Sequence, residues 1–405
     1  MQAICVVVTF AILRHISDMS LYMAMKTLNA LLTCLLLAAC NGSSNDNADV
    51  APPEPPPLPD FTAVNTWLQA FVDENEAFPG ASIIIVDKEL GPIHKAAFGN
   101  QTEDTVALLA SASKVPTATL LMALHEDDDN IDFDIAAPIA DYLPWQGVWD
   151  ERITTEHALS NRSGIPGIVV LFRDPAAYGA HNCQYVPTGT LQACAQLIYE
   201  NPLPELETNA PDTVFEYGGS QWTLSAAVGE IVGGATWQQL WDAYVGQPCG
   251  LEVFRYGNYL SAPQSWDGNP DSLIGIENPN AEGGAISNLD DYARLLSMHL
   301  NDGKCGDNQV LSAEAVAFMQ QARTPAADGW GYGMGWWIIP PEDDASIYLY
   351  VDPGLYGSVS WLDVEREYGG VVLFEEYTGL VAGQGSQGVV NELIPLVEDA
   401  IDALR

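Results

Sequence analysis

Strand-forming segments occur at both ends of the folded part of this chain, and a long helical region separates them. Residues 80–86 and 93–98, joined by a turn around Gly91, predict an antiparallel hairpin. One sheet built from both termini and flanked by helices accounts for this order. We therefore expect an α/β (α+β) fold with a mostly helical domain inserted into the sheet. The later strands are expected at 335–339, 347–351, 358–362 and 368–374.

Helical spacing of apolar residues indicates an opening helix over 64–72 and a closing helix over 389–404. In the middle, a helix is expected to start at Ser287, because Ser287 and Asp290 have the spacing of a capping box. The folded domain should span 61–405, with the inserted helical region at about 125–300. The cleft between sheet and insertion is the natural substrate site. Two further helices are expected around 224–231 and 237–244.

A serine and a lysine, Ser111 and Lys114, are three residues apart at the predicted start of a helix. Residues at this spacing lie on one helix face, so the hydroxyl and the amine can point into the same space. Pro116 lacks an N–H donor and is tolerated only in a first turn. The helix should therefore begin within a residue or two of Ser111, with its positive end facing any oxyanion formed there.

Lys114 is one of five lysines in the chain and lies within an apolar run. An ammonium group is costly in such surroundings, which predicts a lowered pKa for Lys114 and a better proton acceptor. A Ser-x-x-Lys pattern alone also arises by chance. The buried helix is what makes this pair a candidate nucleophile and base.

The charge of the 405-residue chain is extreme, with 54 acidic residues against 14 basic ones and a formal net charge of -40. This balance argues against nucleic acid or an anionic lipid surface as a partner. A solvated acidic surface is the simplest interpretation. Such a surface suits a protein exposed to high salt.

Residues 1–40 are typical of a leader. Met23–Lys26 gives a positive start, Leu28–Leu36 an apolar stretch, and Leu37–Cys40 a small-residue cleavage site ending in cysteine. The last stretch resembles a bacterial lipobox, which implies lipid attachment to Cys40. An ordinary secretory signal cut near Cys40 is the alternative, and either predicts export to the bacterial cell envelope, at the periplasmic or outer-membrane face.

Residues 1–22 are interpreted as lying upstream of the true start, because their apolar run is too short to span a bilayer. Residues 41–60 are rich in Asn, Ser, Asp and Pro, which predicts a disordered tether. The membrane should therefore be reached only through the lipid anchor. The oligomeric state is left open.

Four cysteines follow Cys40, and an even number in an exported chain suggests two disulfides. In the favoured pairing, one disulfide closes a short local loop and the other closes a longer loop, although four cysteines allow three connectivities. Zinc is the weaker alternative, since no Cys-x-x-Cys or histidine pair accompanies them. The favoured pairs are Cys183–Cys194 and Cys249–Cys305.

Several stretches together resemble the serine β-lactamase-like family, which holds class C β-lactamases, D-alanyl-D-alanine carboxypeptidases and family VIII esterases. The resemblance covers nearly the whole chain from about Phe61. Each stretch is weak alone, but their order and spacing are specific. They are Ser111–Lys114, Asp132–Pro138, Tyr142–Pro144, Leu159–Pro166, Pro211–Tyr217, Asn280–Ser287, Gly354–Gly357 and Trp361–Asp363.

The resemblance implies that Ser111 is the acylated nucleophile, Lys114 its base partner and Tyr217 the tyrosine that shares the proton. Whether the lysine or the tyrosine takes the first proton stays open, because interacting groups titrate as a pair. The oxyanion hole would consist of the backbone N–H groups of Ser111 and Leu355. No cofactor and no metal are expected.

Two departures from the family pattern concern substrate binding. The family's Tyr-x-Asn becomes Tyr217-Gly218-Gly219, which loses an amide, and its Lys-Thr-Gly becomes Asp352-Pro353-Gly354, which loses a cation. We expect Gly218, Gly219, Asp352 and Gly354 to contact the substrate. An aspartate there would repel a carboxylate substrate.

The sequence therefore favours an exported serine hydrolase acting on an ester or amide through an acyl-enzyme, with esterase-like activity as the leading hypothesis. The alternatives are β-lactamase or D-alanyl-D-alanine carboxypeptidase activity, and a non-catalytic binding protein of the same fold. An α/β-hydrolase triad is disfavoured because no Gly-x-Ser-x-Gly motif occurs. The identity of the small-molecule substrate should depend on loops such as 168–186.

Overall fold

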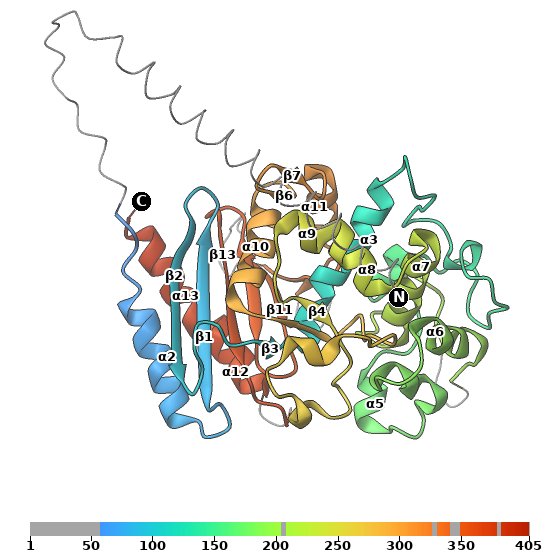
Figure 1. The fold of residues 1–405 in the computed structure, drawn as a ribbon, viewed down its shortest axis with the longest axis horizontal. Coiled ribbons are helices and arrows are strands. Elements are labelled where there is room, and N and C mark those ends of the chain that lie inside the picture. Colours follow the sequence, from blue (N-terminus) through green and yellow to red (C-terminus); the bar gives the residue numbers. More distant parts are fainter. Residues whose placement is uncertain (1–56, 204–207, 326–329, 341–348, 379–381, 405) are drawn as a thin grey trace, which may run out of the picture. The chain divides into compact units, whose positions relative to one another are not determined.

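The computed structural model describes residues 57–203, 208–325, 330–340, 349–378 and 382–404 (Figure 1). The predicted leader, Cys40 and residues 41–56 of the predicted tether lie outside this described part. In the described part, eight antiparallel strands form the main sheet in the order β2-β1-β13-β12-β11-β10-β9-β8. The strand bounds are β1 Gly80–Asp87, β2 Gly91–Gly99, β8 Thr324–Pro325, β9 Gly331–Tyr332, β10 Trp337–Ile339, β11 Leu349–Pro353, β12 Val359–Asp363 and β13 Tyr368–Phe374.

A strand from the N-terminal part of the described chain pairs with one from its C-terminal part in this sheet. Strand β1 pairs with β13 from Ala81 opposite Phe374 to Asp87 opposite Tyr368. The predicted sheet built from both termini is therefore confirmed. The predicted hairpin is also present as β1 and β2.

Both faces of the sheet are covered by helices, as Figure 1 shows. Ile83 and Ile85 pack in the core formed with α2 and α13, whereas Ile84 and Val86 pack in the core that includes α3 and α10. Alternate side chains of a strand point to opposite faces, so a strand buried on both sides needs a continuous apolar run. The helices concerned are α2 Thr62–Glu74, α3 Lys114–Glu126, α10 Leu289–Leu300, α12 Ala382–Gly388 and α13 Ile394–Asp402.

Helices and short strands fill the region between β2 and β8. One predicted boundary is wrong, because α10 begins after Asn288, whose side chain accepts a hydrogen bond from Asp291 N at 2.9 Å. Ser287 instead ends a short strand. The other elements here are α4 Thr155–Leu159, α5 Val169–Arg173, α6 Leu191–Glu200, α7 Ser220–Gly233, α8 Trp237–Trp241, α9 Gln247–Cys249, α11 Ala313–Gln320, β3 Ala107–Leu108, β4 Arg255–Tyr256, β5 Ala285–Ser287, β6 Lys304–Cys305 and β7 Asn308–Gln309.

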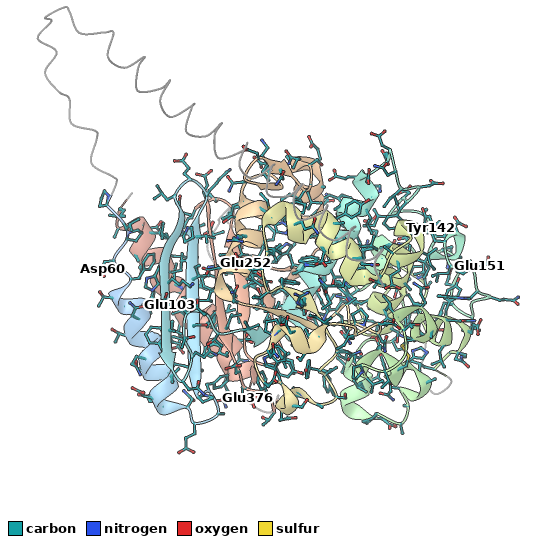
Figure 2. All side chains as sticks on the ribbon, in the orientation of Figure 1. Asp60, Glu103, Tyr142, Glu151, Glu252 and Glu376 are labelled. Carbon is teal, nitrogen blue, oxygen red and sulfur yellow. A yellow bond between two sulfur atoms is a disulfide. The ribbon has the colours of Figure 1, made fainter. Side chains whose placement is uncertain are left out.

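Two disulfides, Cys183–Cys194 and Cys249–Cys305, form as predicted. Disulfides persist in oxidising compartments, so these bonds indicate an extracellular or periplasmic protein. Among the described residues, no helix is long and apolar enough to cross a membrane. Acidic side chains are exposed at separate places on the described surface, as Asp60, Glu103 and Glu151 illustrate (Figure 2).

Candidate active site

A tight turn places Ser111 at the entrance to the buried helix α3. Residues Ala110–Ser113 form a 3-10 turn that runs directly into α3. Pro116 is the third residue of α3, within the first turn as predicted. Ala110 has φ 47°, a left-handed conformation that is uncommon for a residue with a side chain. Such backbone conformations cluster at functional sites.

The predicted serine and lysine lie side by side. Lys114 Nζ is 3.1 Å from Ser111 Oγ and donates a second hydrogen bond, at 3.0 Å, to the carbonyl oxygen of Glu282. The Lys114 side chain is only 1% exposed. The amine is therefore fixed next to the hydroxyl rather than turned into solvent.

Tyr217 completes the predicted trio from the helical region. Its side chain interacts with Ser111, and its ring centroid is 4.7 Å from Lys114 Nζ. The ring packs against Trp337, with centroids 5.3 Å apart. Sequence analysis did not single out Asn161, whose side-chain oxygen accepts hydrogen bonds from Gly218 N and Trp222 Nε1 of this segment.

The pKa of Lys114 differs from the prediction. Burial is the largest single effect and lowers the pKa of Lys114, but Tyr217, Glu282 and Asp352 together outweigh it and raise this pKa. The predicted lowered pKa is therefore wrong. The apolar run around Lys114 suggested only the burial, whereas two carboxyl groups arrive from distant parts of the chain.

Glu282 is the site residue that the sequence analysis missed. Its side chain is 3% exposed, and its Oε2 lies 3.4 Å from Lys114 Nζ. The same oxygen accepts a hydrogen bond from Gly219 N at 2.7 Å, and Oε1 accepts one from Tyr185 Oη at 2.9 Å. The available signal was a single acidic residue inside the glycine-rich stretch Asn280–Ser287.

Gly218 and Gly219 are buried behind Tyr217 and are not among the residues that line the cavity at Ser111. Both have positive φ, of 70° and 84°. A Cβ atom on Gly218 would lie 2.5 Å from Glu282 Oε2, and one on Gly219 would lie 2.5 Å from Tyr178 Oη. The expected substrate contact is therefore replaced by contacts within the protein.

Asp352 also lies behind the cavity wall instead of on it. Its side chain is fully buried, and Oδ2 accepts a hydrogen bond of 3.4 Å from Val115 N on α3. Burial raises the pKa of Asp352 well above its ordinary range, against the opposing effect of Lys114. Asp352 does not line the cavity, so the predicted direct repulsion of a carboxylate substrate is not supported.

Leu355, the predicted second oxyanion donor, lines the same cavity as Ser111, Lys114 and Tyr217. Gly354, just before it, lines the cavity too. Backbone N–H groups at such a position can stabilise the negative charge of a tetrahedral intermediate. The geometry thus brings together every residue predicted for nucleophilic attack.

The cavity at Ser111 has a volume of about 580 Å³. Among the described residues that line it, Lys114 is the only basic one and Glu282 the only acidic one. Most of the remaining wall is apolar, with three of these residues at 168–172 in the loop region expected to shape the site. The apolar side chains are Ala110, Ile168, Val169, Phe172, Leu260, Trp330, Trp337, Pro353 and Leu355.

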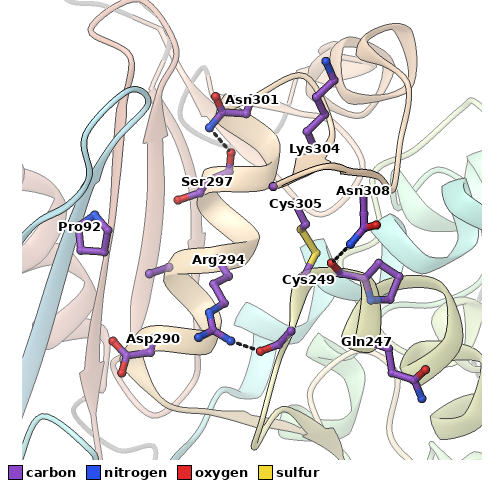
Figure 3. Close-up of a pocket in the computed structure, with 14 residues that line it drawn as sticks. Pro92, Gln247, Cys249, Asp290, Arg294, Ser297, Asn301, Lys304, Cys305 and Asn308 are labelled. Atoms are coloured by element: carbon purple, nitrogen blue, oxygen red, sulfur yellow. Dashed lines mark hydrogen bonds between the residues drawn. A yellow bond between two sulfur atoms is a disulfide. The ribbon is translucent and has the colours of Figure 1, made fainter. Parts of the chain in front are cut away.

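A second, more polar groove of about 860 Å³ lies beside the Cys249–Cys305 disulfide (Figure 3). Arg294 on α10 reaches into it and donates a hydrogen bond to the carbonyl oxygen of Gly250. Ser111 is not part of its lining. Within the described ranges, no group of three or more His, Cys, Asp or Glu residues could hold a metal ion.

Comparisons with known proteins agree with this arrangement. The family model described as Beta-lactamase matches residues 64–384. Penicillin-binding protein 4 from Amycolatopsis lactamdurans is 29% identical over 356 residues, which cover 75% of this chain and 86% of that protein.

Solved structures share the fold at lower identity. The octameric penicillin-binding protein homologue from Pyrococcus abyssi has a TM-score of 0.65 and 19% identity, covering 83% of this chain and 78% of that one. EstCE1, a hydrolase with promiscuous acyltransferase activity, has a TM-score of 0.65 and 19% identity, covering 84% and 97%. These two likenesses concern the fold alone.

Proposed function

This chain is a serine hydrolase of the beta-lactamase and transpeptidase-like family, and we propose that it hydrolyses uncharged esters through an acyl-enzyme on Ser111. The observation that carries the proposal is the largely apolar cavity around Ser111, Lys114 and Tyr217. A β-lactam or a peptide C-terminus would bring a carboxylate, which calls for a cation. The only basic residue described on this wall, Lys114, is already paired with Glu282.

The reaction would proceed in two halves. Ser111 Oγ attacks the ester carbonyl carbon while its proton passes to the Lys114 and Tyr217 pair. The N–H groups of Ser111 and Leu355 stabilise the oxyanion, and the alcohol leaves with a proton. Water then attacks the acyl-enzyme by the same path and releases the acid. EstCE1, a hydrolase with promiscuous acyltransferase activity, has the same fold, which supports acyl-group chemistry as the activity of this site.

The test is covalent labelling combined with turnover. A fluorophosphonate probe should label the wild-type protein at Ser111, and Ser111→Ala should lose both labelling and hydrolysis of p-nitrophenyl esters. Tyr217→Phe, which keeps the ring, should lower kcat on the order of 100-fold, the usual size of a general acid-base contribution. Absence of both labelling and turnover in the wild type would favour a non-catalytic binding protein.

A parallel assay with a cephalosporin distinguishes ester hydrolysis from β-lactamase activity. The proposal expects ester hydrolysis to exceed cephalosporin hydrolysis clearly in kcat/KM. Faster cephalosporin turnover would instead identify a β-lactamase and reject the ester proposal.

Export and lipid attachment at Cys40 belong to the same proposal. In a bacterial host, the full chain should fractionate with membranes, and Cys40→Ala should release the protein into the soluble envelope fraction. A wild-type chain that is already soluble would exclude the anchor.

A further inference from the structure

The Lys114 amine lies between an acceptor and a carboxylate. Ser111 Oγ is 3.1 Å from Nζ, and Glu282 Oε2 is 3.4 Å from it. An ammonium group has no free electron pair and cannot accept the serine proton. Because the surrounding groups raise the pKa of Lys114 despite its burial, the resting amine needs a place to put its own proton.

Two carboxyl groups are close enough to affect the pKa of Lys114, and they differ in the hydrogen-bond donors that they receive. Glu282 receives donors from Gly219 N, Tyr185 Oη and Lys114 Nζ. Asp352 receives one long hydrogen bond, and its Oδ1 has no hydrogen-bond partner. Donors favour an ionised carboxylate, and their scarcity favours a neutral acid. Glu282 Oε2 is also the carboxylate oxygen that lies 3.4 Å from Lys114 Nζ, so it is the one placed to exchange a proton with the lysine.

The glycine pair after Tyr217 makes room for this carboxylate. The left-handed backbone of Gly219 aims its N–H at Glu282 Oε2. A Cβ on Gly218 would lie 2.5 Å from the same oxygen. A side chain at position 218 would therefore displace the carboxylate from the lysine.

We propose that Glu282 is a positioning residue that holds Lys114 beside Ser111 and takes up the lysine's proton during acylation. This role rests on the proposed ester hydrolysis. It identifies the group that accepts the proton from Lys114. The trio Ser111, Lys114 and Tyr217 does not contain such a group.

The proton balance is simple. A proton moves from Lys114 Nζ to Glu282 Oε2, turning an ammonium and a carboxylate into a neutral amine and a neutral acid. Ser111 Oγ then bonds to the ester carbonyl carbon, and its proton bonds to Nζ. When the carbon–oxygen bond to the alcohol breaks, that proton leaves with the alcohol through Lys114 and Tyr217. Deacylation returns the proton from water to Ser111 Oγ, and Glu282 returns its proton to Lys114.

This exchange frees the amine without drawing on bulk solvent, because the proton that leaves Lys114 stays on Glu282 until deacylation ends, so the acylation rate should not depend on bulk pH near neutrality. Other titratable groups face the pair and stay in place in the variants below. Around Lys114 these are Tyr217 and Asp352, and around Glu282 they are Tyr178, Tyr185, Tyr217 and Tyr332.

The decisive variant is Glu282→Gln. Glutamine has the same shape, and its oxygen can still accept from Gly219 N and Lys114 Nζ while its amide faces the Tyr185 hydroxyl. Only the proton-accepting charge is lost. Glu230→Gln is the matched control, because Glu230 is a partly buried glutamate on α7 with its own partners, Gln192 and Trp237 N.

The measurement is kcat and KM for p-nitrophenyl butyrate from pH 6 to 9, with melting temperature recorded for each variant. Wild type and Glu230→Gln should give flat profiles through neutral pH. In Glu282→Gln, kcat at pH 7 should fall on the order of 100-fold with KM nearly unchanged, and should rise about tenfold per pH unit as bulk solvent removes the lysine proton. Glu282→Asp should keep the flat profile at an intermediate kcat.

The outcomes separate the hypotheses. A Glu282→Gln variant with wild-type kcat and a flat profile overturns the role of Glu282 and leaves the proposed hydrolysis standing. A loss of kcat that is equal at every pH shows a structural role only and also overturns it. If Glu282→Gln does not fold, Glu282→Asp decides, and wild-type kcat in that variant overturns the proposal. A wild type with neither turnover nor Ser111 labelling overturns both proposals.

Discussion

The carbonyl oxygen of Leu109 occupies the space that a side chain on Gly354 would need. A Cβ atom built on Gly354 would lie 2.3 Å from this oxygen, far inside van der Waals contact. The end of β11 therefore rests directly on the backbone that leads into the Ser111 turn. This close approach carries Leu355 to the same cavity as Ser111.

We expect Gly354→Ala to damage catalysis more than binding. The methyl group forces the end of β11 away from Leu109 and with it the N–H of Leu355, the proposed oxyanion donor. Loss of one such donor lowers kcat by about 100- to 1,000-fold. Steady-state kinetics with an ester substrate should show this fall with a small change in KM.

Gly383→Ala is the matched control, because Gly383 lines the same cavity and a Cβ there would meet no atom within 4 Å. Its kcat should stay close to wild type. Equal loss in both variants would argue that the cavity wall, and not the β11 contact, controls the rate.

Val169→Trp should shorten the range of acyl chains that the enzyme accepts. Val169 lines the cavity from α5 and is 43% exposed, so an indole can be placed there without disturbing the core. Each buried methylene contributes about 0.8 kcal/mol, and loss of room for two lowers kcat/KM on the order of tenfold. The ratio of p-nitrophenyl octanoate to p-nitrophenyl acetate turnover measures the effect.

Ile274→Trp provides the comparison, since Ile274 is 66% exposed and is not among the residues that line the cavity. Its chain-length profile should match wild type. An unchanged octanoate rate in Val169→Trp would show that the acyl chain lies elsewhere.

The sequence predicted most of the main sheet because its physical signal is local. A strand buried on both faces must be largely apolar, and residues 83–86 show such a run directly. The serine, lysine and tyrosine were likewise predictable from their motifs, and the structure brings all three together. The start of α10 was misassigned because Ser287 and Asn288 are both good capping residues in sequence.

The environment of Lys114 could not be predicted in the same way. The contacts of Glu282 depend on the left-handed backbone of Gly218 and Gly219, which are distant in sequence. The pKa of Lys114 then follows from charges that only the folded chain assembles. The residue pattern around Lys114 predicted that its side chain is buried, but it did not indicate which charged groups contact the amine.

The two disulfides should contribute unequally to stability. In the chain-entropy treatment a longer closed loop restricts the unfolded chain more, and the sequence separations here are 11 for Cys183–Cys194 and 56 for Cys249–Cys305. Replacing each pair by serine should cost about 3 and about 4 kcal/mol, respectively. Urea unfolding with unchanged m-values measures both, and the reverse order would contradict the loop-length argument.

His299 should make stability depend on pH. It is buried, its Nε2 lies 3.1 Å from Thr119 Oγ1, and burial lowers its pKa to about 4 from an ordinary 6.5. The unfolded chain therefore binds a proton between these values more readily than the native one. This contribution is fully present above pH 6.5 and is lost as pH falls toward 4.

Between pH 7.5 and pH 5, wild type should lose about 2 kcal/mol more unfolding free energy than His299→Gln. The comparison with the variant removes the background from the many carboxylates. His125→Gln, at the half-buried C-terminal end of α3, is the control for the loss of a different histidine. Parallel pH dependence in wild type and His299→Gln would exclude this histidine as a source.

The pairing of β1 with β13 has a consequence for how activity is acquired during synthesis. Ser111 emerges from the ribosome well before β13, the strand beside β1, and before Leu355, which lines the cavity at Ser111. A nascent or prematurely terminated chain therefore carries its nucleophile without the groups that make it reactive. The proposed hydrolysis should therefore begin only after the segment from Leu355 to Phe374 has been synthesised and has paired with β1.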